Sequence, residues 1–113
     1  MISIVNYKEG MENDLWNVYF SAIRLVCINN YSLKQVQAWA PDQFNMDIWA
    51  NKLHELNPFV AKIRSSIVGY ADLQQDGLID HFFVHGEHQS VGVGGLLMKS
   101  ILQKGQHMEK LYW

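Results

Sequence analysis

The pattern of apolar residues divides the chain into a helical first half and a strand-rich second half. Residues 2–6 alternate weakly between apolar and polar positions, which favours a short first strand. Apolar residues recur at helical spacing over residues 15–26 and again over residues 46–56. Between these segments, Ser32 and Gln35 form a capping-box pattern that predicts a short helix ending near Trp39. We therefore expect one strand and three helices before residue 57.

Polar residues mark the ends of these predicted helices. Asn13 or Asp14 can cap the first helix, and Asn29-Asn30 can end it. Pro58 predicts the end of the third helix, because a proline disfavours helical backbone in the residue before it. One face of that third helix is predicted to carry its apolar residues, which are Ile48, Trp49, Leu53 and Leu56.

The period changes to two in the second half of the chain. Short β-branched and aromatic runs, separated by turns with Ser, Asp and Gly, occupy Phe59–Ile63, Ile67–Leu73 and Leu78–Val84. A helix is expected over Gly92–Lys104 with Gly105 as its stop, and Lys110–Trp113 is expected to begin another strand. The resulting order, β-α-α-α-β-β-β-α-β, predicts an α+β fold with a mixed, mostly antiparallel sheet flanked by helices.

Composition places the chain among globular domains. Its 113 residues are 49% hydrophobic and 18% charged, which predicts one domain over residues 1–113 with a substantial core. A formal net charge of -2 provides no electrostatic footprint for nucleic acid or an anionic membrane. The sequence shows no signal-peptide or membrane-spanning pattern, and its single cysteine, Cys27, cannot form an intrachain disulfide. We therefore expect a cytoplasmic protein.

Residues 78–98 hold the pattern that points to chemistry. An apolar strand ending at Val84 leads through a polar loop into Gly92-Val93-Gly94-Gly95, at the start of a helix. Free amides at such a turn favour a pyrophosphate, and glycine lets a phosphate approach the backbone closely. The glycines can also serve only to start the helix and to pack it on the sheet. The pattern is neither Walker A nor the dinucleotide fingerprint.

This segment resembles the signature of the GNAT superfamily of N-acetyltransferases. The signature is Gln/Arg-x-x-Gly-x-Gly/Ala, and the chain has Gln89-Ser90-Val91-Gly92-Val93-Gly94. Upstream, Ile67–Ala71 resembles the family's third strand, with its glycine at Gly69. Together with the element order, the motif predicts a GNAT-like fold.

The resemblance implies a site for acetyl-CoA as cosubstrate. The pyrophosphate is expected on the amides of Gln89, Ser90, Val91, Gly92, Val93 and Gly94. The backbone of Phe83 and Val84 is expected to pair with the pantetheine arm, with the Val84 amide polarising the thioester carbonyl. Many relatives carry Arg where this chain has Ser90 and Val91, so phosphate binding is expected to depend mainly on backbone amides.

The activity implied is acetyl-CoA-dependent N-acetylation, in which a primary amine of an unidentified small molecule or peptide attacks the thioester directly. Asp80 and His81 are the candidate general bases, and strand alternation places them on opposite faces. Asp80 can instead pair with a lysine or cap a turn, and His81 can be a partly buried structural histidine.

Three histidines near the end of the predicted strand invite a zinc interpretation. His81, His85 and His88, with Glu87 between the last two, are irregularly spaced across a strand end and a loop. A solvated loop explains these residues better, and no metal site is predicted.

The resemblance ends at Trp113, whereas the family continues with further strands and a helix. We therefore expect a domain that is incomplete at its C-terminus and lacks the last elements of the fold. An unfinished sheet leaves an exposed edge, which favours a homo-oligomer. The alternative function is a truncated, catalytically inactive GNAT-like protein that binds CoA weakly or serves only as an oligomerising module.

Overall fold

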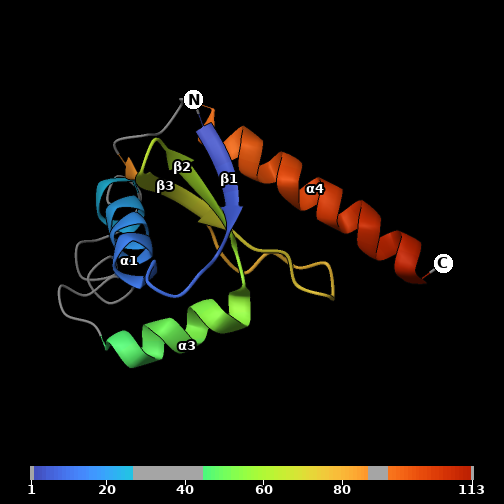
Figure 1. Ribbon diagram of the computed structural model, residues 1–113, viewed down its shortest axis with the longest axis horizontal. Coiled ribbons are helices and arrows are strands. Elements are labelled where there is room, and N and C mark those ends of the chain that lie inside the picture. The colour runs from blue at the N-terminus through green and yellow to red at the C-terminus, as the bar shows by residue number, and fades with distance from the viewer. Residues whose placement is uncertain (1, 27–44, 87–91, 113) are drawn as a thin grey trace.

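The computed structural model describes residues 2–26, 45–86 and 92–112, and these form an α+β fold, as predicted (Figure 1). A four-stranded sheet carries α1 and α3 on one face and α4 on the other. The strands are β1 (Ile2–Asn6), β2 (Phe59–Ile63), β3 (Ser66–Ala71) and β4 (Phe82–Val84). The helices are α1 (Glu12–Ser21), the π-helix η1 (Ala22–Val26), α3 (Met46–Leu56) and α4 (Val93–Tyr112).

The described strands lie in the order β1-β2-β3-β4, and each pairs antiparallel with its neighbour. The turn from β2 to β3 is tight, with Arg64 in the left-handed region at φ 58°. A register shift between Ala61 and Lys62 interrupts the β2–β3 ladder. In the described sheet, β1 and β4 are therefore the two edge strands.

Alternation along the strands divides the core into two layers. The aromatic layer, beneath α1 and α3, consists of Leu15, Trp16, Val18, Trp49, Leu53, Leu56, Val60 and Tyr70. The aliphatic layer, beneath α4, consists of Ala61, Val68, Ala71, Leu73, Val93, Leu97 and Ile101. Successive strand residues enter opposite layers because side chains alternate across a sheet.

The first helix begins earlier than its predicted caps. Asn13 and Asp14 lie inside the first turn of α1, and Glu12 is the first helical residue, so the predicted cap was wrong. The Glu12 carboxylate instead reaches back and accepts the Gly10 amide at 2.9 Å. This contact satisfies a backbone donor just before the helix, whereas no side chain caps the first helical amides from the N-cap position, Met11. The predicted helix from Ser32 to Trp39, and its boundary at Asn29-Asn30, lie outside the described residues.

The helix α3 was predicted well, except for one residue. The Asn45 side chain caps its start, and Asn57 ends it in the left-handed conformation, immediately before Pro58. Trp49, Leu53 and Leu56 are buried, but Ile48 is 69% exposed. The buried residues follow an i, i+4, i+7 stripe, and Ile48 lies outside that stripe, so its predicted burial was wrong.

The helix α4 begins at Val93, next to its predicted start at Gly92, but it continues well past its predicted C-terminal end at Lys104. Gly105 does not stop it, and the expected strand at Lys110–Trp113 is wrong because helix continues to Tyr112. A glycine inside a helix costs only about 1 kcal/mol, and the Gln, Met, Glu and Lys residues that follow are good helix formers. A Cβ on Gly105 would lie 3.6 Å from Leu73 Cδ2, so this glycine lies against the end of the sheet.

Candidate functional site

The direction of the β4 backbone decides which peptide groups face outward. The His85 amide donates to Val68 O at 2.8 Å, and the Asp72 amide donates to His81 O at 3.2 Å. Peptide groups of alternate residues point the same way in an antiparallel ladder. The peptide groups of Phe83, which opposes Tyr70, therefore face β3. The peptide groups of Phe82 and Val84 face away from β3. Of the two residues predicted to pair with the pantetheine arm, Val84 therefore has outward-facing peptide groups and Phe83 does not.

The start of α4 presents amides without helical partners. The Leu96 amide makes the first helical bond, to Gly92 O at 3.2 Å, so the amides of Val93, Gly94 and Gly95 precede the ladder. Gly92 needs its glycine because its φ is 90°. A Cβ would fit at Gly94, with Phe82 Cε1 at 3.8 Å, and at Gly95, with nothing within 4 Å. Backbone conformation therefore explains Gly92, and helix packing requires glycine at neither position 94 nor position 95. Gln89, Ser90 and Val91 lie outside the described residues.

Close packing of α4 on the sheet depends on Gly69 in β3. A Cβ there would lie 2.9 Å from Val93 Cγ1 and 3.1 Å from Phe83 O. Gly69 is also the register partner of Val84. The missing side chain thus lets the start of α4 settle next to the end of β4. Two predicted parts of the site, the β4 backbone and the glycine turn, are brought together in this way.

Asp80 lies in the connection before β4 rather than in the strand, because β4 begins at Phe82 and not at Leu78 as predicted. The Lys52 Nζ donates to Asp80 Oδ2 at 2.8 Å, and the Asp80 side chain is 49% exposed. The hydrogen bond from Lys52 lowers the pKa of Asp80 below its ordinary value. A carboxylate with a lowered pKa is a weaker base, and its position fits the lysine-paired interpretation.

His81 lies on the aromatic side of the sheet, partly buried. Its Nδ1 is 2.9 Å from the Tyr70 hydroxyl. Its ring stacks on Tyr19, with ring centres 5.7 Å apart, and meets Phe83 edge-on at 5.4 Å. Burial lowers the pKa of His81 below 6.5, so the imidazole is neutral at pH 7.

A buried carboxylate, Asp72, fixes the backbone of both candidate bases, and sequence reasoning missed it. It is fully buried and accepts the His81 amide at 2.6 Å and the Asp80 amide at 3.3 Å. The Gln74 side chain donates to it at 2.5 Å. A charged residue directly after the apolar run that ends at Ala71 was the available signal, since a buried charge needs such partners.

The two described histidines of the zinc interpretation, His81 and His85, do not lie together. His85 lies four residues beyond His81, about 13 Å along an extended strand. The His85 Nδ1 lies 3.4 Å from Ser21 Oγ. Glu87 and His88 lie outside the described residues. Among the residues that the structure does describe, there is no group of three or more His, Cys, Asp or Glu that could hold a metal ion.

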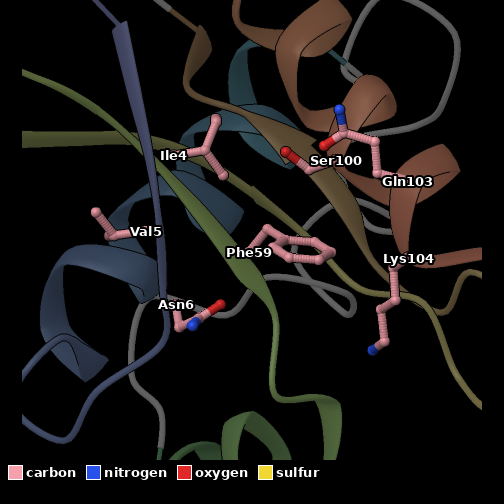
Figure 2. A pocket seen from close by; sticks show the side chains of 7 residues that line it. All are labelled: Ile4, Val5, Asn6, Phe59, Ser100, Gln103 and Lys104. Carbon is pink, nitrogen blue, oxygen red and sulfur yellow. The ribbon is translucent and has the colours of Figure 1, made fainter. Parts of the chain in front are cut away.

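A separate hollow of about 480 Å³ lies between β1 and α4, near the opposite edge of the sheet from β4 (Figure 2). Figure 2 shows Ile4, Asn6 and Phe59 from the strands facing Ser100, Gln103 and Lys104 from the helix. The Lys104 Nζ donates to Leu73 O at 2.7 Å, so the ammonium group of Lys104 holds α4 against the segment that follows β3. No predicted site residue lines this hollow, and we do not assign the site to it.

A family model described as the acetyltransferase (GNAT) domain matches residues 27–111. The chain belongs to the GNAT acetyltransferase family. This GNAT chain is 30% identical over 102 residues to an uncharacterized N-acetyltransferase, YafP, of Escherichia coli strain K12. The match covers 90% of the chain and 66% of YafP, so the chain spans less than two thirds of that relative's length.

Solved structures agree with the GNAT assignment of the fold. A GCN5-related N-acetyltransferase of Rhodopseudomonas palustris superposes with a TM-score of 0.86 at 21% identity, over 93% of this chain and 66% of that one. The PaiA N-acetyltransferase of Thermoplasma acidophilum, solved with coenzyme A, has a TM-score of 0.76 at 15% identity, over 97% of this chain and 73% of that one.

None of the helices in the described ranges has the length and apolar character needed to cross a membrane.

Proposed function

We propose that this GNAT chain takes part in transfer of an acetyl group from acetyl-CoA to a primary amine of a small molecule or peptide. One observation carries the proposal: the outward-facing peptide groups of β4 lie next to the amides at the start of α4 that precede its helical hydrogen bonds. A strand-like pantetheine arm and a pyrophosphate need these two features side by side. The CoA-bound PaiA relative supports the same use of this fold.

Gly92, Val93 and Gly94, which are the described residues of the Gln89–Gly94 motif, fit a pyrophosphate. The start of a helix carries partial positive charge, and the amides of Val93 and Gly94 are not used by the helical hydrogen bonds of α4. Glycine at position 94 leaves room for close approach to the backbone. Because Ser90 and Val91 carry no charge, we propose that the backbone supplies most of the binding.

Bound acetyl-CoA would supply a thioester whose carbonyl carbon accepts the amine. The amine nitrogen forms a bond to that carbon, the carbon–sulfur bond breaks, the nitrogen loses a proton and the thiolate gains one. We propose that the Val84 amide, which faces away from β3, donates to the carbonyl oxygen as negative charge develops on it. Removing one such donor typically costs about 10²–10³-fold in kcat.

Of the two candidate bases, we propose that His81 rather than Asp80 faces the acceptor. His81 lies on the side of the sheet that α1 and α3 cover, and the family resemblance places the acceptor next to the early helices. It is neutral at pH 7, because burial lowers its pKa. Asp80 is held by Lys52 and is a weaker base than a free aspartate.

Calorimetry with acetyl-CoA tests the binding part of the proposal, and two glycines provide a matched pair of variants. Gly92→Glu puts bulk and negative charge at the proposed pyrophosphate turn. Gly77→Glu makes the same change at another exposed glycine of positive φ, 84° against 90°. Both variants carry similar backbone strain. We expect wild type and Gly77→Glu to bind and Gly92→Glu to lose all measurable heat.

Three results would contradict these proposals. Absence of binding by the wild-type chain at millimolar acetyl-CoA would remove the proposed function. Equal loss in both glutamate variants would show that the site was placed wrongly. Binding without thiol release over a panel of primary amines would favour the inactive alternative instead.

The homo-oligomer also remains a proposal, and an exposed apolar surface on α4 supports it. Met98 and Leu102 are exposed there, and with Ile79 they help to line a hollow of about 470 Å³. Such a surface favours contact with a second chain. Light scattering that shows a monomer at every accessible concentration would refute this proposal.

A further inference from the structure

The contact between Tyr70 and His81 has a direction that follows from burial. Tyr70 is 0% exposed, at the centre of β3, and its hydroxyl lies 2.9 Å from His81 Nδ1. No other hydrogen-bond partner of this hydroxyl occurs among the described residues. A buried donor left unpaired is costly, so the hydroxyl proton points at the imidazole.

The hydroxyl keeps its proton under all ordinary conditions. Burial raises the pKa of Tyr70 well above 10. A neutral imidazole has one acceptor nitrogen and one donor nitrogen. If Nδ1 accepts from Tyr70, the His81 proton must lie on Nε2.

The surroundings hold the imidazole in this arrangement. Tyr19 stacks on one face of the ring with an interplanar angle of 15°, and Phe83 meets it at 89°. The Asp72 carboxylate holds the His81 amide at 2.6 Å. Contacts within the protein therefore set both the orientation of the His81 ring and the position of the His81 backbone, without any contact to the acceptor.

We propose that Tyr70 is a positioning residue that holds the proton of His81 on Nε2, so that His81 meets the acceptor as a hydrogen-bond donor and not as its base. The part about the acceptor rests on the proposed acetyl transfer, whereas the tautomer does not. A donor at this place fits an amine that carries a hydroxyl, carbonyl or carboxylate oxygen near its nitrogen. The proton of the attacking nitrogen then leaves to water.

The tautomer can be measured without any activity. In uniformly ¹⁵N-labelled protein at pH 7.5, long-range ¹H–¹⁵N correlation distinguishes a proton on Nε2 from one on Nδ1. We expect the Nε2–H form for His81 in the wild type and a mixture of forms in Tyr70→Phe. Tyr7→Phe, which removes a hydroxyl bound to Glu12 instead, should leave the His81 signals unchanged. An Nδ1–H form in the wild type would overturn the proposal.

Kinetics with two substitutions of His81 separate a donor from a base. Glutamine can donate from a position near that of Nε2 but cannot take up a proton. If His81 is a donor, His81→Gln should keep kcat/KM within about threefold and His81→Ala should lose about tenfold. If His81 is the base, both should lose about 10²–10⁴-fold, and that result would overturn the proposal.

The two measurements keep this proposal and the proposed function apart. Absence of acetyl transfer by the wild type, with the Nε2–H form observed, would refute the proposed function and leave the tautomer standing. Transfer with the Nδ1–H form would do the opposite. Tyr70→Phe should fold, because it removes one oxygen and leaves the ring in place; retention of the far-ultraviolet circular dichroism checks this.

Discussion

The two faces of the sheet are built by different rules. In the aromatic layer, aromatic side chains that end in a polar atom have hydrogen-bond partners. Trp49 Nε1 donates to Glu12 O at 2.9 Å, and the Tyr70 hydroxyl contacts His81 Nδ1. The buried side chains of the aliphatic layer have no polar atoms. In this layer, Gly69 sets how closely α4 approaches the sheet. The polar side-chain contacts of the described core therefore lie on the aromatic face, whereas close backbone packing sets the position of α4 on the aliphatic face.

The strand β4 belongs to both faces. Phe83 points into the aromatic layer with His81 just before it, while Phe82 and Val84 pack against the aliphatic layer. A ligand along the outer edge of β4 would thus meet side chains from one layer and amides from the other.

The largest effect is expected from a cavity in the aliphatic layer. Leu97 is fully buried, so Leu97→Ala should lower the free energy of unfolding by about 2–5 kcal/mol. Leu102→Ala, in the same helix but 59% exposed, should change it by about 0.5 kcal/mol or less. Urea denaturation measures both. Equal losses would mean that α4 does not pack on the sheet as described.

The next effect concerns the polar support on the aromatic side. Asp72 accepts donors on both oxygens, so Asp72→Asn must turn an amide NH₂ toward another donor. We expect a loss of about 1–3 kcal/mol in the free energy of unfolding. Amide hydrogen exchange should rise at His81 and Asp80 more than in α4. Uniform loss of protection would indicate that Asp72 stabilises the whole fold rather than this connection.

A smaller loss is expected where α4 crosses β3. Gly69→Ala forces a Cβ against Val93 and a backbone oxygen, which should cost about 1–2 kcal/mol by overpacking. Gly95→Ala meets nothing within 4 Å and should be neutral or stabilise by up to about 1 kcal/mol. Thermal unfolding distinguishes the two. A neutral Gly69→Ala would show that this close approach is not needed.

The smallest effects are expected in the dependence of stability on pH. The folded-state pKa of His81 lies below 6.5, so the unfolded chain binds more protons and stability falls as pH drops below about 6.5. The folded-state pKa of Asp80 lies below 3.8, so its contribution is present above that pH and is lost as pH falls through the lowered value. The Asp80–Lys52 pair is well exposed and is worth at most about 1 kcal/mol.

Two variants separate these pH ranges in urea denaturation. His81→Gln should flatten the decline between pH 7 and pH 5, whereas Asp80→Asn should change the curve only below about pH 4. Other carboxylates titrate in the acid range, so the comparison is between each variant and the wild type at the same pH. An unchanged decline in His81→Gln would mean that His81 is not held neutral by burial.

Periodicity predicted most of the regular elements, and the errors at Gly105 and at Ile48 have different causes. The β2–β3 hairpin, α3 and the start of α4 follow from local patterns that burial reinforces. The helix end predicted at Gly105 and the strand predicted at Lys110–Trp113 were both wrong. A glycine inside a helix costs about 1 kcal/mol, which is too little to end a helix whose neighbouring residues favour it. The prediction that Ile48 lies on the same face as Trp49 was wrong, because spacing alone does not show where the buried stripe of a helix ends.

Local residue patterns account for the antiparallel hairpins, the helical segments and the glycine motif that resembles the GNAT signature. The contacts of the candidate side chains depend instead on how the elements pack. Asp80 meets Lys52, 28 residues away, and His81 meets Tyr70, 11 residues away. No period relates such positions, because these contacts exist only after α3 and β3 have packed beside the connection to β4. The chemistry of each side chain follows from that packing.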